Sequence, residues 1–300
     1  MIRKIINRTK MDEIIKAISN DGFISVSVVD SLKITKDAQE VHGTSPIATD
    51  ALGRTLAAAS IIGTTLKKQD STVTVAINGG GPAGNIVAVS DESGFVRGFI
   101  QNPRFISSVA EPGKPDIRDF VGRQGMLSVT RDYREKEPYT GATRLVSGDI
   151  SGDISSYFKE SEQIPTKAVF GTLFDEHGSI TASGGFISQL LPGVHDEKTG
   201  DLFSNIDTSG IIAELLKTGG AQAVLDYIFR ESSYRIMARM TVGYRCTCSR
   251  ESFLSAVLSL DRNEIDDMRR KAEPIEAICQ FCRAVYTFMP EELGELSNLS

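Results

Sequence analysis

Near the start of the chain, the spacing of apolar residues changes at Gly22. Between residues 11 and 19, three isoleucines follow a helical spacing, and Gly22 then provides a stop signal. From residue 23 to residue 29, branched residues alternate with small polar ones, which is the pattern of a half-buried strand. The pattern therefore predicts a short helix over 11–19, followed by a strand over 23–29.

An alanine-rich stretch follows, and Pro46 stands where a first helical turn would accept it. The stretch predicts a long buried helix over 47–68. Beyond it, short segments rich in branched residues are separated by turn residues, as expected of strands. We expect these strands at residues 72–77, 86–89, 95–100 and 126–130.

The second half of this region mixes both periodicities. Residues 150–162 predict a helix, and residues 168–174 with 179–187 predict a hairpin around the turn at 176–178. Strands and helices that interleave irregularly favour an α+β fold over a doubly wound sheet. We therefore expect residues 1–195 to form one α+β core domain with a mixed sheet.

A glycine-rich loop at residues 79–84 formally contains the spacing G-x-G-x-x-G. A dinucleotide site needs a helix directly after this loop, so that the helix N-terminus meets the pyrophosphate. Here a strand-like segment follows, and no Gly-Lys-Ser/Thr ending is present. The loop is therefore interpreted as a hairpin connection.

Residues 196–240 form a different kind of segment, a helical linker. Ser209 can cap a short helix over 211–217, Gly219 and Gly220 end it, and a second helix covers 221–230. Such short amphipathic helices need a partner surface, so they are either packed permanently on the core or dependent on a neighbouring module. Their apolar residues are Ile211, Ile212, Leu215, Leu216, Val224, Leu225, Ile228 and Phe229.

Composition places the chain among globular proteins, because 40% of its 300 residues are hydrophobic. The basic start lacks the apolar core of a signal peptide, and no apolar run is long enough to span a membrane. We therefore expect a cytoplasmic protein, whose thiols stay reduced unless oxidants intervene.

All four cysteines lie in the last 55 residues, as a Cys-x-Cys pair, Cys246 and Cys248, and a Cys-x-x-Cys pair, Cys279 and Cys282. Each pair can chelate one edge of a single tetrahedral ion, so a site for one zinc ion is the first interpretation. Each pair is also close enough in sequence to become a disulfide. Oxidation of both pairs would release the metal and unfold the tail.

Charge and the other reactive residues narrow the function classes. The whole chain carries a net charge of −6, and residues 241–300 hold seven basic residues against ten acidic ones, which counts against a nucleic-acid partner. The histidines His42, His177 and His195 are isolated in sequence and fit no zinc-protease or hydrolase motif. We expect no enzyme and no catalytic residues.

With its flanks, the tail closely resembles the redox-switch domain of the bacterial 33 kDa chaperonin (heat-shock protein 33) family. The matching tail segments are Cys246-Thr247-Cys248-Ser249-Arg250-Glu251, Cys279-Gln280-Phe281-Cys282 and Tyr286-x-Phe288. The core carries similar segments, among them Ser45-Pro46, Ala51-Leu52-Gly53-Arg54, Pro138-Tyr139-Thr140-Gly141 and Gln189-Leu190-Leu191-Pro192-Gly193. One departure is Arg283, where the family more often has glycine.

The resemblance implies an ATP-independent holdase. Reduced, zinc-bound members are largely inactive; oxidants convert the cysteines to two disulfides, zinc leaves, and the linker unfolds to bind unfolding client proteins, usually with formation of a homodimer. By position, the four cysteines would be both zinc ligands and redox sensors, with disulfides Cys246–Cys248 and Cys279–Cys282. The apolar linker residues would be candidate client contacts, and residues 241–300 the C-terminal zinc-binding redox-switch domain.

Two other function classes stay open at this point. A nucleic-acid-binding zinc module predicts salt-sensitive binding of RNA or DNA. A thiol-disulfide oxidoreductase would act through Cys279 and Cys282, and it leaves the Cys-x-Cys pair unexplained.

Overall fold

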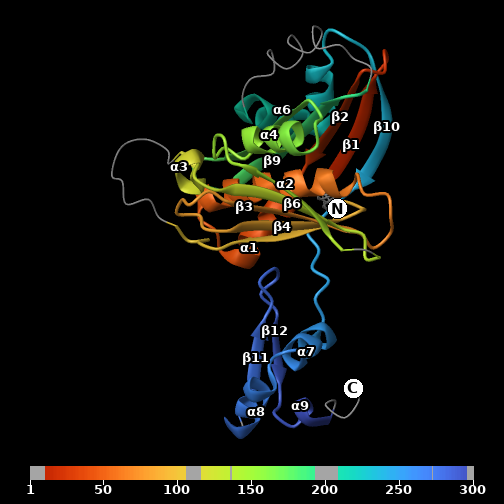
Figure 1. Ribbon diagram of the computed structural model, residues 1–300. Coiled ribbons are helices and arrows are strands. Elements are labelled where there is room, and N and C mark those ends of the chain that lie inside the picture. Colours follow the sequence, from red (N-terminus) through yellow and green to blue (C-terminus); the bar gives the residue numbers. More distant parts are fainter. Residues whose placement is uncertain (1–10, 106–115, 136, 193–208, 272, 296–300) are drawn as a thin grey trace, which may run out of the picture. The chain divides into compact units, whose positions relative to one another are not determined.

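The computed structural model describes residues 11–105, 116–135, 137–192, 209–271 and 273–295, and it divides into two compact units (Figure 1). We call Met1–Arg245 the core unit and Cys246–Ser300 the cysteine unit. The α+β class expected from the sequence is confirmed.

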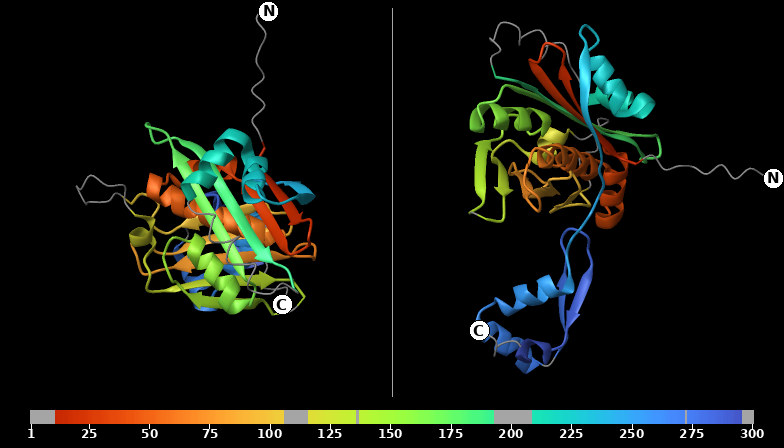
Figure 2. Two further views of the ribbon diagram at one scale, coloured as in Figure 1. Left: turned by 90° about the horizontal axis from the view of Figure 1, so that it is seen from above. Right: turned by 90° about the vertical axis from the view of Figure 1, so that its right-hand side faces the viewer.

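The first sheet of the core unit has the strand order β10-β1-β2-β9-β8, and all its neighbours are antiparallel. Strand β10, from the end of the unit, lies beside β1, from its start (Figures 1 and 2). The strands are β1 (Glu13–Ser19), β2 (Ile24–Asp30), β8 (Thr166–Phe174), β9 (Ile180–Leu190) and β10 (Tyr234–Thr241). The predicted hairpin around residues 176–178 is the β8–β9 hairpin.

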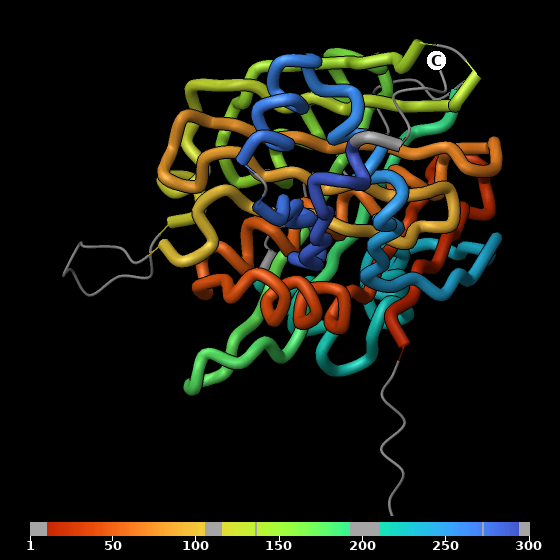
Figure 3. Tube along the Cα trace, turned by 90° about the horizontal axis from the view of Figure 1, so that it is seen from below, coloured from red at the N-terminus to blue at the C-terminus, as the bar shows by residue number. Residues whose placement is uncertain are grey.

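The second sheet has the order β5-β4-β3-β6-β7 and is also antiparallel, so that its strands run back and forth beside one another (Figure 3). The glycine-rich loop joins β3 to its antiparallel neighbour β4, which confirms the hairpin interpretation. The strands are β3 (Thr72–Asn78), β4 (Ile86–Asp91), β5 (Val96–Ile100), β6 (Met126–Asp132) and β7 (Tyr139–Arg144).

Helix α2 (Pro46–Gly63) contacts strands of both sheets, and 14 of its 18 residues are buried. A helix that is buried on most of its surface needs such a position, because each buried face must pack against another element. The other helices described in this half of the unit are α1 (Leu32–His42), α3 (Ile117–Val121) and α4 (Ser151–Ser161). The predicted helices over 47–68 and 150–162 are confirmed, the first ending at Gly63.

Helix α6 (Ser209–Ile228) covers the opposite face of the first sheet, where it contacts β8, β9, β2 and β1 (Figure 2). Gly220 interrupts it with φ 66° and ψ −160°, so the two short helices predicted from the sequence are present and the chain turns between them. Residues 193–208, including His195, lie outside the described residues. The functional division into residues 1–195, 196–240 and 241–300 stays a prediction.

The helix predicted over 11–19 is wrong, because this segment is strand β1. Ile14 and Ile15 are both fully buried, Ile14 in the cluster around α2 and Ile15 in the cluster under α6. A strand covered on both faces places apolar residues at successive positions and loses the alternation that marks a strand in sequence.

The cysteine unit contains a short hairpin and three helices within its described residues. Helix α8 is highly charged, with Glu264 in its first turn and Arg269, Arg270 and Lys271 in its last. The elements are α7 (Arg250–Leu258), α8 (Arg262–Lys271), β11 (Ile275–Ile278), β12 (Val285–Phe288) and α9 (Glu292–Glu295).

Candidate metal centre

One arm of the site is the turn of the β11–β12 hairpin. Cys279 directly follows β11; its amide donates to the Ala284 carbonyl at 2.9 Å, and the Arg283 amide donates back to the Cys279 carbonyl at 2.8 Å. Arg283 itself has φ 62°, in the left-handed region that favours glycine. Arg283, where this sequence departs from the family's usual glycine, therefore stands at a position whose backbone conformation favours glycine.

The other arm precedes helix α7. Ser249 is the N-cap of this helix, since its hydroxyl accepts the Ser252 amide, and the cap fixes where the extended chain carrying Cys246 and Cys248 ends. The next residue, Arg250, donates to both carboxylate oxygens of Glu292 at 2.7 and 2.9 Å. Its guanidinium also donates to the Thr287 carbonyl at 3.1 Å. These contacts tie the first arm to the hairpin that carries the second.

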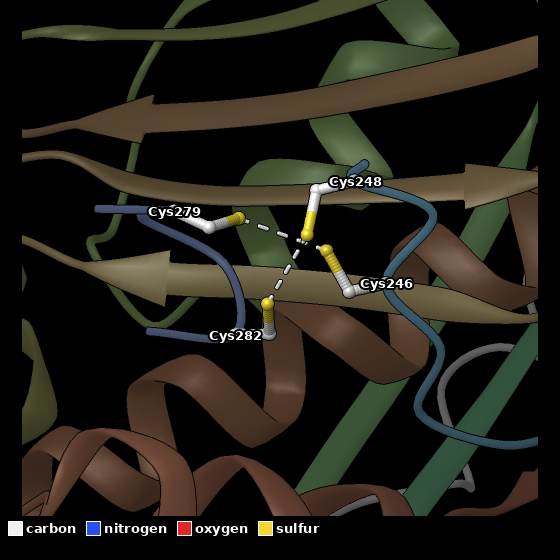
Figure 4. A group of neighbouring side chains, drawn as sticks. All are labelled: Cys246, Cys248, Cys279 and Cys282. Atoms are coloured by element: carbon white, nitrogen blue, oxygen red, sulfur yellow. Dashed lines mark hydrogen bonds between the residues drawn. The ribbon is translucent and has the colours of Figure 1, made fainter. Parts of the chain in front are cut away.

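The four thiols converge between these arms (Figure 4). The sulfurs of Cys246 and Cys279 are 3.7 Å apart, those of Cys248 and Cys282 are 3.4 Å apart, and all four lie within 4.8 Å of one another. Sulfurs about 2.3 Å from a shared tetrahedral zinc are separated by about 3.8 Å, so the cluster has the size and the donor set for this ion. All four cysteines are free thiols in the structure.

A tyrosine contacts the cluster from β12. The hydroxyl of Tyr286 lies 3.1 Å from Cys248 Sγ and 3.3 Å from the Cys248 carbonyl. Its ring stacks on Phe253 of α7, with the ring centroids 5.0 Å apart. The stack fixes the direction in which the hydroxyl points.

The electrostatics of the thiol cluster favour a bound cation. Burial raises the pKa of Cys246 and of Cys282. Burial also acts to raise the pKa of Cys248, but hydrogen bonds from Tyr286 and the other thiols outweigh it and lower that pKa to about 7. The bond to Cys248 raises the pKa of Tyr286 to about 12. Closely spaced sulfurs resist joint ionisation unless a cation compensates the charge.

Little apolar material surrounds the cluster. Among the residues of the cysteine unit whose side chains are described, the buried ones are Cys279, Phe288, Pro290 and Leu293. Helices α7 and α8 bury none of their residues. The thiol cluster is therefore a large part of what can hold this unit together.

The apolar residues predicted for the linker lie in the core unit, on α6 and just after it. Six of the eight are buried in the cluster between α6 and the first sheet: Ile212, Leu216, Val224, Leu225, Ile228 and Phe229. Leu215 packs partly buried at its margin, and Ile211 is 43% exposed. The structure thus gathers these side chains on one surface, although α6 is interrupted at Gly220.

Two contacts of the site escaped the sequence argument. Tyr286 and Arg250 stand in the segments that carry the family resemblance, but neither was assigned a role. Neither contact leaves a local pattern in the sequence. The Tyr286 hydroxyl contacts a sulfur 38 positions away, and the Arg250 guanidinium donates to a carboxylate 42 positions away.

A family model described as Hsp33 protein matches residues 12–289 of this chain. The chain belongs to the Hsp33 family. A curated relative named 33 kDa chaperonin, from Bacillus pumilus, is 38% identical over 287 residues, with 95% of this chain and 98% of the relative covered. The 33 kDa chaperonin of Bacillus subtilis is 37% identical, with 96% and 99% covered.

A solved structure agrees with this assignment. The crystal structure of the 33 kDa chaperonin of Thermotoga maritima is similar to this chain with a TM-score of 0.83 and 31% identity, covering 96% of this chain and 98% of that one. Membership of the Hsp33 family supports a chaperone function. The relatives' name denotes a chaperone and not an enzyme. Within the described residues, no helix is long and apolar enough to cross a membrane.

Proposed function

We propose that this chain is a redox-regulated, ATP-independent holdase that is activated when oxidants convert its four cysteines to disulfides. In the reduced state, Cys246, Cys248, Cys279 and Cys282 would hold one zinc ion, and the protein would be largely inactive. A bound zinc ion keeps its sulfur ligands deprotonated and links the two arms. The pairs expected after oxidation are Cys246–Cys248 and Cys279–Cys282.

The observation that carries the proposal is the gathering of four thiols, from two distant arms, in a unit with few buried side chains. A unit with a large core would keep its fold after losing a metal. Here the loss of four sulfur donors removes the main link between α7 and the β11–β12 hairpin. The chemistry of the site is thereby coupled to the folding of the unit.

The redox step balances with peroxide as the oxidant. A thiolate attacks one peroxide oxygen, which forms a sulfenic acid and releases hydroxide. The second thiol of the pair then attacks that sulfur, which forms the disulfide and releases water. Each pair of thiols thus gives up two electrons as its disulfide forms and reduces one peroxide molecule, and formation of both disulfides leaves no thiolate to hold the zinc.

Client binding requires apolar surface that the reduced fold keeps covered. Ile212, Leu216, Val224 and Leu225 are each at most 4% exposed against the first sheet. We infer that unfolding of the linker after oxidation exposes this set to unfolding client proteins, and that the oxidised chain forms a homodimer. Such a switch suits the cytoplasm, where thiols are reduced until oxidants accumulate.

The test measures zinc and activity in the same sample. Zinc release is followed with a chromogenic chelator while suppression of citrate synthase aggregation is recorded, before and after peroxide at mildly elevated temperature. The proposal predicts loss of one zinc per chain in step with a gain in anti-aggregation activity, both reversed by reductant plus zinc. Zinc that stays bound, or that leaves without any gain in activity, would overturn it.

A further inference from the structure

We propose that Tyr286 is a positioning residue that restrains the reactivity of Cys248 by donating a hydrogen bond to its sulfur. The inference rests on the proposed function, because it concerns the same thiols and asks what sets their response to oxidants. Under this inference, a side chain other than the four cysteines helps to set how readily the thiols react with an oxidant.

The geometry holds the tyrosine hydroxyl on one particular sulfur. Tyr286 lies on β12, and pairing of Ala277 with Tyr286 ties its backbone to β11. Its ring stacks on Phe253 at 5.0 Å, and its oxygen lies 3.1 Å from Cys248 Sγ. Both ends of the side chain are therefore fixed, one by the sheet and the other by the sulfur.

The direction of the hydrogen bond follows from the charge of the acceptor. A thiolate has no hydrogen to donate, so the phenol must be the donor when Cys248 is ionised. The Cys248 carbonyl, at 3.3 Å, competes for the same hydrogen. The charged sulfur is the closer and the stronger acceptor, so the hydroxyl donates its hydrogen bond mainly to the sulfur.

A donated hydrogen bond withdraws electron density from the sulfur and makes it a weaker nucleophile. Hydrogen bonds to charged groups are about twice as strong as those between neutral groups. When the basicity of a thiolate changes, the logarithm of its rate of attack changes by roughly half as much as its pKa. Removing the hydroxyl should therefore raise the rate of attack by Cys248 about three- to tenfold.

The effect should be specific for one thiol. The Tyr286 hydroxyl lies 3.1 Å from Cys248 Sγ, whereas the other sulfur contacts described join thiols to one another, Cys246 to Cys279 and Cys248 to Cys282. A change at the tyrosine hydroxyl therefore removes a described contact of Cys248. A general loosening of the site would instead accelerate all the thiols together, so the ratio of rates separates the two explanations.

The variant Tyr286→Phe keeps the ring and its stack on Phe253 while it removes the hydroxyl. Reduced, zinc-loaded full-length protein is treated briefly with iodoacetamide, so that less than one thiol per chain reacts. The thiolate displaces iodide and forms a carbon–sulfur bond, and mass spectrometry of peptides gives the fraction modified at each cysteine. Tyr139→Phe, which removes an exposed hydroxyl from β7 of the core unit, is the matched control.

We expect Tyr286→Phe to raise alkylation of Cys248 about three- to tenfold relative to Cys282, and to speed peroxide-driven zinc release, with Tyr139→Phe unchanged. An unchanged ratio of Cys248 to Cys282, or equal acceleration at both, would overturn the inference. The wild-type protein tests the proposed function separately. If it binds no zinc or gains no activity with peroxide, the holdase proposal fails whatever the alkylation ratio.

Discussion

The core unit and the cysteine unit are stabilised in opposite ways. In the core unit, the first sheet is covered on both faces, by α2 on one side and α6 on the other, and two clusters of apolar side chains fill the layers. In the cysteine unit, helices α7 and α8 bury none of their residues. Four thiols lie within 4.8 Å of one another there, and few other described side chains are buried.

Under the proposed function, this difference is what would make one unit sensitive to oxidants and the other insensitive. Hydrophobic burial does not respond to peroxide, whereas thiol ligands are lost on oxidation. A unit whose fold depends on its thiols therefore loses that fold when they form disulfides. The core unit contains no cysteine, so we expect the same oxidant to leave the pairing of β2 with β9 intact.

Removal of the metal should unfold the cysteine unit and leave the core unit folded. Structural zinc contributes on the order of 10 kcal/mol in finger-sized units, more than the stability such a unit can otherwise have. Chelation of zinc from the reduced protein should abolish hydrogen-exchange protection across residues 246–293 and leave the strands of the core unit protected. A cysteine unit that stays protected without metal would show that it has a sufficient core of its own.

The packing of α6 offers the next test. Phe229 is 2% exposed and stacks on Tyr234 with ring centroids 4.8 Å apart. Phe229→Ala should destabilise the core unit by about 3–5 kcal/mol, as measured by urea unfolding of the reduced, zinc-loaded protein. Ile211→Ala, at a residue of α6 that is 43% exposed, is the matched control and should change stability by less than about 0.5 kcal/mol. Equal losses of stability in the two variants would mean that the layer between α6 and the first sheet is not a hydrophobic core.

The stability of the core unit should depend on pH through a buried carboxyl group. Burial raises the pKa of Asp12 from 3.8 to about 7, against hydrogen bonds from the Lys33 and Ile34 amides that lower it. Because the folded state holds the proton more tightly than the unfolded state, this group stabilises the fold below about pH 4. That contribution is lost as pH rises through about 7.

The stability of the core unit should therefore fall between about pH 4 and pH 7 through Asp12, and Asp12→Asn should flatten that slope. Urea midpoints of the zinc-loaded protein measured across this range provide the check. The slope of stability against pH is the quantity to compare between wild type and variant. The amide introduced by Asp12→Asn would have one oxygen in place of two, so it would lose one of the two backbone hydrogen bonds and lower the stability at every pH. An unchanged slope in the variant would assign the pH dependence to other groups.

The smallest effect is expected at Arg283, whose φ of 62° is disfavoured for a side chain with a Cβ. Arg283→Gly should stabilise the hairpin turn by about 1 kcal/mol, which corresponds to roughly fivefold tighter zinc binding in a competition assay. Arg283→Ala keeps the Cβ and removes the charge, so it should leave zinc affinity nearly unchanged. Equal gains in both variants would trace the effect to charge and not to the backbone.

Much of the fold was predictable because local patterns and tertiary structure agree. The alanine-rich helix α2, the glycine-rich β3–β4 hairpin and the break of α6 at Gly220 follow from composition and turn residues. Strand β1 was missed because Ile14 and Ile15 both face apolar layers, and a sheet covered on two sides gives no alternating signal.

The candidate site divides in the same way. Four cysteines in two pairs predict their own convergence, since few other arrangements use that spacing. The contacts of Tyr286 and Arg250 depend on how the hairpin and α7 pack together, and no local pattern specifies that packing. Residues that support the thiols are therefore visible only in the folded unit.

Hydrogen exchange on the full-length protein would show whether oxidation of the thiols uncovers the apolar surface under α6, with the reduced, zinc-loaded form compared with the peroxide-oxidised form. We expect the amides of residues 246–293 and of α6 to lose protection on oxidation, while those of β2 and β9 keep it. If the oxidised chain has both disulfides and no zinc, yet α6 is as protected as before, then oxidation of the thiols does not expose the apolar surface under α6, and the proposed redox switch is wrong.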